Sequence, residues 1–213
     1  MEYGCIYRKK KYYQGTGWYH LYADITGKNW QTKQVFLKLD AASKAAAIYM
    51  NGRKIGEHNG GYTACTFDIT PFCSFDAPNS LAIHVDNARQ DIPPISADFT
   101  FFGGIYRDVW LTAVPKQHFH LTNYGSEGIF ISTPQVSEEK GTILIRGEIK
   151  NDAKQKASLE LEHIIYNPDG SIAQTQKQSI QIKGGELYSF RTETAPILSP
   201  PIIGHPRLLI STE

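Results

Sequence analysis

Few side chains in this 213-residue sequence are spaced as a reactive centre requires. Acid–base chemistry needs two carboxyl groups held close together, and the candidate pairs among the 21 Asp and Glu residues fall on solvent faces of predicted strands or in turns. Cys5, Cys65 and Cys73 are an odd number without Cys-x-x-Cys spacing, which indicates neither a disulfide framework nor a zinc site. Cys65 and Cys73 could pair in an oxidising compartment, but two free thiols are favoured. Scattered histidines such as His58 and His84 lack convergent metal ligands. We therefore predict no catalytic residue, no metal site and no cofactor.

The motif with the largest number of candidate functional residues runs from Gly103 to Asp108. Its two glycines allow a tight turn into a strand that contains Val109 and Leu111. Arg107 presents five donors in a fixed fork, so we expect it to pair with a buried carboxylate and to tie the loop in place. The motif therefore predicts a structural role for Arg107 rather than a ligand-binding one.

Aromatic side chains are the other group with binding potential, because their faces can pack against sugar rings and equally well fill a core. The candidates for such a platform are Tyr12, Tyr13, Trp18, Tyr19 and Trp110. The residue types alone leave both roles open.

Composition limits the possible partners of the protein and the kind of fold that can hold these side chains. A net charge of +1 argues against a nucleic-acid or anionic-membrane partner, since both need a basic face. The longest apolar run, Ala45 to Met50, is far short of the roughly 20 residues of a membrane helix. With 12 Tyr, 10 Phe, 18 Gly and 11 Pro, the composition favours strands joined by tight turns.

Period-two alternation of apolar residues recurs along the chain and predicts short strands. A first set includes Val35 to Leu39, Leu81 to Val85 and Val109 to Ala113, and Asn51-Gly52 is a strong hairpin signal. After a polar stretch at 123–128, a second set follows at 143–149, 159–165, 179–182 and 187–191. No window of a dozen residues carries a helical apolar stripe. We predict an all-β protein of two β-sandwiches, with domains at residues 1–115 and 116–213.

Four segments, taken in order, resemble one family. They are Gly15-Thr16-Gly17-Trp18-Tyr19, then "IYMNGRKIGEHNGGYTACTFDIT", "LAIHVDN" and "DFTFFGGIYRDVWL". This order resembles the amino-terminal sugar-binding domain of glycoside hydrolase family 2, the β-galactosidase and β-glucuronidase family. The resemblance implies a jelly-roll sandwich, similar to galactose-binding domains, for residues 1–115 and an immunoglobulin-like sandwich for residues 116–213.

The resemblance also implies that this chain lacks the catalytic machinery. In the family, the acid and the nucleophile are two glutamates on a (β/α)₈ barrel that follows the immunoglobulin-like domain, and no alternation of strands and helices is predicted before Glu213. Retaining hydrolysis needs those two carboxyl groups about 5–5.5 Å apart. We expect the chain to be inactive alone and its partners to be a downstream barrel and a carbohydrate. Whether the parent protein is exported to the periplasm or beyond is left open.

Asp98 is the one substrate-binding residue that the resemblance implies. It lies five residues before Gly103, in the pattern Asp-x-x-x-x-Gly-Gly-Ile-Tyr-Arg-Asp. In β-galactosidases of the family, the aspartate at this place reaches the active site on the barrel and contacts substrate hydroxyls. A solvated loop acid is the alternative interpretation. The two functional hypotheses are a non-catalytic fragment of a retaining β-galactosidase-like hydrolase and a free-standing carbohydrate-binding module.

Overall fold

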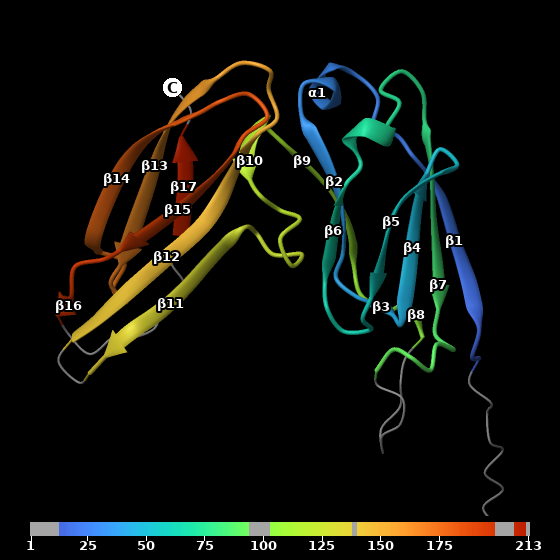
Figure 1. Cartoon of the computed structure of the whole chain (residues 1–213), viewed down its shortest axis with the longest axis horizontal. Coiled ribbons are helices and arrows are strands. Elements are labelled where there is room, and N and C mark those ends of the chain that lie inside the picture. The colour runs from blue at the N-terminus through green and yellow to red at the C-terminus, as the bar shows by residue number, and fades with distance from the viewer. Residues whose placement is uncertain (1–12, 94–102, 138–139, 199–206, 212–213) are drawn as a thin grey trace, which may run out of the picture. The chain divides into compact units, whose positions relative to one another are not determined.

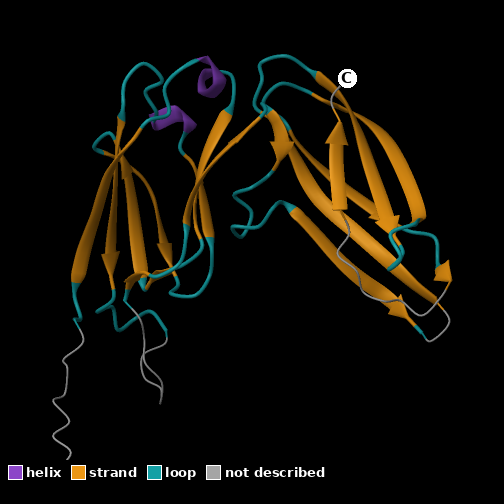
Figure 2. Cartoon of the chain, turned by 180° about the vertical axis from the view of Figure 1, so that it is seen from behind, coloured by secondary structure: helices purple, strands orange, loops and turns teal. Residues whose placement is uncertain are grey.

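A computed structural model of the chain describes residues 13–93, 103–137, 140–198 and 207–211. The chain divides into two compact units that are not contiguous in sequence. One unit comprises Met1–Gly27 and Leu37–Leu111, and the other comprises Lys28–Phe36 and Thr112–Glu213. Figures 1 and 2 show strands throughout both units. The helical elements among the described residues are the short α-helix α1 (Lys28–Gln31) and the 3-10 turn η1 (Thr70–Phe72).

The larger sheet of the first unit has the order β1-β7-β4-β5 and is antiparallel throughout. Its strands are β1 (Thr16–Ala23), β7 (Asn79–Asp86), β4 (Ala45–Met50) and β5 (Arg53–Asn59). Strands β4 and β7 alternate strictly between buried and half-buried residues, with Ile48 opposite Ile83 on the buried side. The predicted period-two pattern therefore marks the face that forms the core.

The remaining strands of the first sandwich form a three-stranded sheet, β6-β2-β9, and a short pair, β3-β8 (Figure 1). Their bounds are β6 (Cys65–Asp68), β2 (Gln34–Leu39), β9 (Val109–Val114), β3 (Ala42–Ser43) and β8 (Gly104–Ile105). Strand β2 lies between two neighbours and is buried on both faces except at Lys38. It is the central strand of its sheet.

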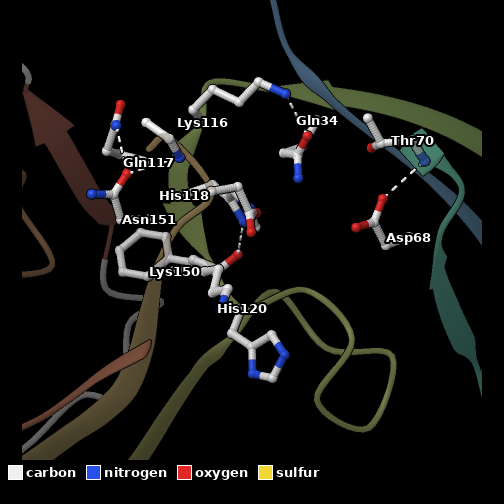
Figure 3. Close-up of polar contacts among 12 residues, drawn as sticks. Gln34, Asp68, Thr70, Lys116, Gln117, His118, His120, Lys150 and Asn151 are labelled. Carbon is white, nitrogen blue, oxygen red and sulfur yellow. Dashed lines mark hydrogen bonds and ion pairs between the residues drawn. The ribbon is translucent and has the colours of Figure 1, made fainter. Parts of the chain in front are cut away.

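Two turns in this unit follow from their sequences. Asn51 and Gly52 adopt φ values of +52° and +76°, which confirms the predicted hairpin between β4 and β5. Asp68 accepts a hydrogen bond from the Thr70 amide at 2.9 Å, so its side chain forms an Asx turn that leads into η1 (Figure 3).

The second unit contains two further antiparallel sheets. In one, β12 (Lys140–Asn151) is paired with β10 (Gln117–Phe119), β11 (Ile129–Val136), β15 (Leu187–Glu193) and β16 (Ile197–Leu198). In the other, β13 (Ala157–Tyr166) lies between β14 (Ile172–Ile182) and β17 (Arg207–Ser211).

The fold class predicted from the sequence, a jelly-roll sandwich followed by an immunoglobulin-like sandwich, is confirmed. The boundary between residues 115 and 116 stays a prediction.

The main hydrophobic cluster of the second unit is aliphatic apart from one aromatic ring, Phe190. Ile145, Ile149, Leu159, Leu161, Ile180, Ile182 and Phe190 form the buried cluster. His163 lies 3% exposed on β13, with its ring centroid 5.8 Å from that of Phe190. Its Nε2 has no hydrogen-bond partner among the described residues, and burial lowers the pKa of the imidazole.

Lys116 and His118 contact the first residues of β2 and the residue just before it. Lys116 Nζ donates to Gln34 Oε1 at 2.6 Å and to Lys33 O at 3.1 Å (Figure 3). The Phe36 ring packs edge-on against His118 at 5.2 Å, and His118 Nε2 lies 2.8 Å from Asp152 Oδ2. These contacts explain why residues 28–36 belong to the second unit.

Candidate functional site

Asp98 lies outside the described residues. The structure describes the two ends of the segment that carries it, which leaves after Pro93 and returns at Gly103. We call residues 87–93 and 103–107 the loop base. Because this base anchors the segment, its contacts are where the first unit can influence Asp98.

The outgoing side of the loop base begins at Asn87, which is fastened to the start of β1. Its Oδ1 accepts from the Gly15 amide at 2.7 Å, and its Nδ2 donates to Tyr13 O at 3.0 Å. Two segments that carry the family resemblance, Gly15-Thr16-Gly17 and Leu81 to Asn87, therefore meet here.

Lys44 and Asp91 hold the outgoing segment a few residues later. The Lys44 side chain is almost fully buried, and its Nζ donates to Arg89 O at 3.1 Å. Arg89 Nε donates to Asp91 Oδ1 at 2.7 Å, and this hydrogen bond lowers the pKa of Asp91 to about 2. Asp91 therefore stays ionised near neutral pH.

The returning side of the loop base begins at Gly103 and Gly104. At either position, a side chain would collide with a neighbouring residue. Gly104 has φ +81°, and a Cβ there would come within 2.3 Å of the Tyr19 hydroxyl. A Cβ on Gly103 would come within 2.0 Å of Asn87 Nδ2. The Ile105 amide donates to the Tyr19 hydroxyl at 3.2 Å, and β8 pairs with β3. Gly104 is therefore required both by its positive φ and by the close approach of Tyr19, and Gly103 by the close approach of Asn87.

Tyr106 ties the returning segment to a neighbouring loop. Its hydroxyl donates to Gly61 O, and its ring packs against Tyr62 with centroids 6.4 Å apart. Burial raises the pKa of Tyr106, so the phenol keeps the proton that it donates.

The buried carboxylate that we expected as the partner of Arg107 is not found among the described residues. Arg107 is exposed and forms no hydrogen bond or ion pair with another described residue; its guanidinium instead lies 5.6 Å from the centre of the Tyr106 ring. A guanidinium at an exposed strand rim remains hydrated, and the neighbouring phenol already fastens the backbone. The sequence signal that could have identified Tyr106 is its position in the same motif.

The aromatic candidates do not form one platform. Tyr13, Trp18, Tyr19 and Trp110 are 72%, 62%, 43% and 51% exposed, while Tyr12 lies outside the described residues. Trp18 and Tyr19 are adjacent on β1 and point to opposite faces, whereas Trp110 lies on β9 in another sheet and donates from Nε1 to Asp40 Oδ2 at 2.8 Å. None of these four acts as a core filler.

The described residues contain no group of three or more His, Cys, Asp and Glu side chains that could hold a metal ion. Within the same residues, Cys65 and Cys73 are free thiols, as expected, and burial raises the pKa of each to about 11. No helix in the described ranges is long and apolar enough to cross a membrane.

Comparison with known proteins assigns the chain to a family. The model of the sugar-binding domain of glycosyl hydrolases family 2 matches residues 7–115, which is more than half of the chain. The chain belongs to glycoside hydrolase family 2. The loop base and all four segments that carry the resemblance lie within this match.

Relatives within family 2 are β-glucuronidases and β-galactosidases. A β-glucuronidase of Bacteroides fragilis is 31% identical over 157 residues, which cover 73% of this chain and 22% of that protein. A β-galactosidase of Thermoanaerobacter pseudethanolicus is 28% identical over 182 residues, 82% of this chain and 24% of that protein. The chain also superposes on the crystal structure of Bacteroides uniformis β-glucuronidase with a TM-score of 0.88 and a sequence identity of 64%. The match covers 92% of this chain and 23% of that protein's chain. This family 2 chain thus spans about a quarter of the length of such relatives.

Proposed function

We propose that the chain is a non-catalytic part of a larger retaining β-glycosidase. Its first unit supports a catalytic barrel located elsewhere in the whole protein and lends the segment with Asp98 to the substrate site. The whole enzyme hydrolyses a terminal β-linked sugar through a covalent glycosyl-enzyme with retention of configuration. Membership of family 2, together with a length about a quarter of that of the relatives, is the observation that carries this proposal.

The substrate that we propose first is a terminal β-glucuronide. The chain is 64% identical to the Bacteroides uniformis β-glucuronidase, against 28% identity to the Thermoanaerobacter pseudethanolicus β-galactosidase. A β-galactoside is the competing substrate, since proteins of both names occur among the relatives. The contacts to the sugar carboxylate, which decide between the two, would come from the barrel.

The role of the loop base in this proposal is to limit where Asp98 can go. Both ends of its segment are fastened by hydrogen bonds, one through Asn87 and the other through Ile105 and Tyr106. A substrate contact held by fixed ends loses less conformational entropy when the sugar binds. This arrangement supports Asp98 as a positioned substrate ligand.

The test uses the full-length protein that contains this chain, assayed with 4-nitrophenyl β-glucuronide and β-galactoside. We expect hydrolysis of the glucuronide, and we expect Asp98→Asn to lower kcat/KM by about tenfold or more because a hydrogen bond to the sugar is lost. Asp169→Asn, a matched change in an exposed turn of the second unit, should leave kcat/KM unchanged. Wild-type kinetics for Asp98→Asn would overturn the role of Asp98, and no hydrolysis of either glycoside would overturn the function.

A further inference from the structure

The outer face of the sheet β1-β7-β4-β5 carries an unusual set of side chains. Trp18, His20 and Tyr22 alternate along β1 and therefore point to the same side, away from the buried face of β4 and β7. Trp18 is 62% exposed and Tyr22 is 73% exposed. Outward positions of an antiparallel sheet are normally polar, so large exposed rings at this spacing need an explanation.

The Trp18 ring is held in place by two other rings on the same face. Trp18 lies opposite His84 in the register, and their ring centroids are 4.8 Å apart. Tyr49 of β4, one strand beyond β7, also contacts it, with its ring centroid 5.6 Å from that of Trp18. A ring packed against two others has fewer orientations open to it, so less side-chain entropy is lost when a ligand packs on its exposed surface.

Hydrogen-bonding groups lie beside the rings. His20 Nε2 is 2.9 Å from Ser80 Oγ, and the His20 ring meets Tyr22 edge-on at 5.0 Å. Neighbouring outward positions on β4 and β7 are occupied by alanines, namely Ala45, Ala47 and Ala82, which add only methyl groups to this face. Rigid aromatic faces next to hydroxyl and imidazole groups match a pyranose ring, which offers C–H groups on its faces and hydroxyls at its edge.

Charge decides which kind of carbohydrate the face fits. The charged side chains on the described part of this face are Lys54, Glu57 and Asp86, and Lys54 is neutralised by Glu57 at 2.7 Å. The face thus lacks the unpaired cation that would attract an anionic sugar. Trp18 and Tyr22 are four residues apart, about 13 Å along an extended strand, which exceeds the width of one sugar ring.

We propose that this face, defined by Trp18, His20, Tyr22, Tyr49 and His84, binds an uncharged oligosaccharide or polysaccharide chain. Trp18 and Tyr22 each stack on a sugar ring, and His20 and Ser80 hydrogen-bond to hydroxyls between them. The inference goes beyond the proposed hydrolytic function and does not require it, because binding to this face needs only the residues of the first unit.

The experiment is native gel electrophoresis of the purified 213-residue chain in gels that contain a soluble polysaccharide. Galactan, xyloglucan and glucomannan are the uncharged probes, and polygalacturonate is the anionic one. We expect at least one uncharged polysaccharide to retard the chain. Isothermal titration with oligosaccharides of that polymer should show that Trp18→Ala and Tyr22→Ala each weaken binding by about tenfold or more.

Trp110→Ala is the matched control, because Trp110 is a similarly exposed tryptophan on a strand of another sheet. It should bind like the wild type. Circular dichroism establishes that each variant is folded, and Tyr22→Ala decides the matter if Trp18→Ala does not fold. The proposal is overturned if no uncharged polysaccharide retards the chain, if only polygalacturonate does, or if Trp110→Ala weakens binding as much as the platform variants.

Discussion

The Tyr19 hydroxyl accepts a hydrogen bond from the Ile105 amide at 3.2 Å, across 86 residues of sequence. This contact joins β1 to the strand that follows the segment with Asp98. Each partner belongs to a motif that carries the family resemblance, Gly15 to Tyr19 on one side and Gly103 to Asp108 on the other. The two motifs therefore act together: one supplies the phenol, and the other supplies the glycines that let it approach.

We expect Gly104→Ala to destabilise the chain more than Gly170→Ala. Both glycines have a positive φ, +81° and +85°, so each alanine suffers similar backbone strain. A Cβ at Gly104 also meets the Tyr19 hydroxyl at 2.3 Å, whereas nothing lies within 4 Å at Gly170. The additional cost at Gly104 should be about 1–3 kcal/mol in the free energy of unfolding. Urea denaturation measures it, and equal losses for the two variants would show that Tyr19 moves aside freely.

Tyr106→Phe should cost about 1 kcal/mol of stability, because it removes the hydrogen bond to Gly61 O. Arg107→Gln should change the free energy of unfolding by less than about 0.5 kcal/mol, since Arg107 is exposed and contacts only the Tyr106 ring among the described residues. Thermal unfolding of both variants compares the two. A larger loss for Arg107→Gln would restore the anchoring role that its sequence context suggested.

The buried imidazole of His163 should make stability fall in mild acid. Its pKa in the folded state lies below the ordinary 6.5, so the unfolded chain binds the proton more readily. This contribution to stability is fully present above about pH 6.5 and is lost as the pH falls from there toward the folded-state pKa. His163→Phe should therefore flatten the dependence of the unfolding free energy on pH just below 6.5. Parallel curves for wild type and variant would contradict this.

The isolated chain should release no nitrophenol from aryl β-glucuronides or β-galactosides. The physical reason is that retaining hydrolysis needs an acid and a nucleophile about 5–5.5 Å apart, and the proposed function assigns both to a barrel outside these 213 residues. Turnover that scales with chain concentration, above a buffer control, would refute the expectation.

Alternation predicted the strands better than it predicted their burial. Val109 and Leu111 lie on a strand as expected, yet they are 39% and 37% exposed because β9 is at the edge of its sheet. On β2, Phe36 alternates with the buried Val35 and Leu37, yet it is itself buried, against His118. A two-residue period identifies strands and faces, whereas the neighbours of a face depend on contacts between residues far apart in sequence.

Some features of the candidate site could likewise be predicted from the sequence, and others could not. The glycines at 103–104 and the Asx turn at Asp68 follow from local backbone requirements and could be predicted. The position of Tyr106 in the same motif marked it as a candidate, but its partner could not be predicted, because the acceptor Gly61 lies 45 residues away. The platform residues His20, Tyr22, Tyr49 and His84 were missed, although the alternation from Trp18 to Tyr22 was a signal.

The membership of residues 28–36 in the second unit limits how the protein can be cut or recombined. A gene fragment that starts at residue 116 would omit Phe36 and Gln34, the partners of His118 and Lys116. It would also leave the buried His118 side of the sandwich uncovered. Swapping the second sandwich between homologues as a cassette should therefore succeed only when residues 28–36, which include α1, are transferred with it.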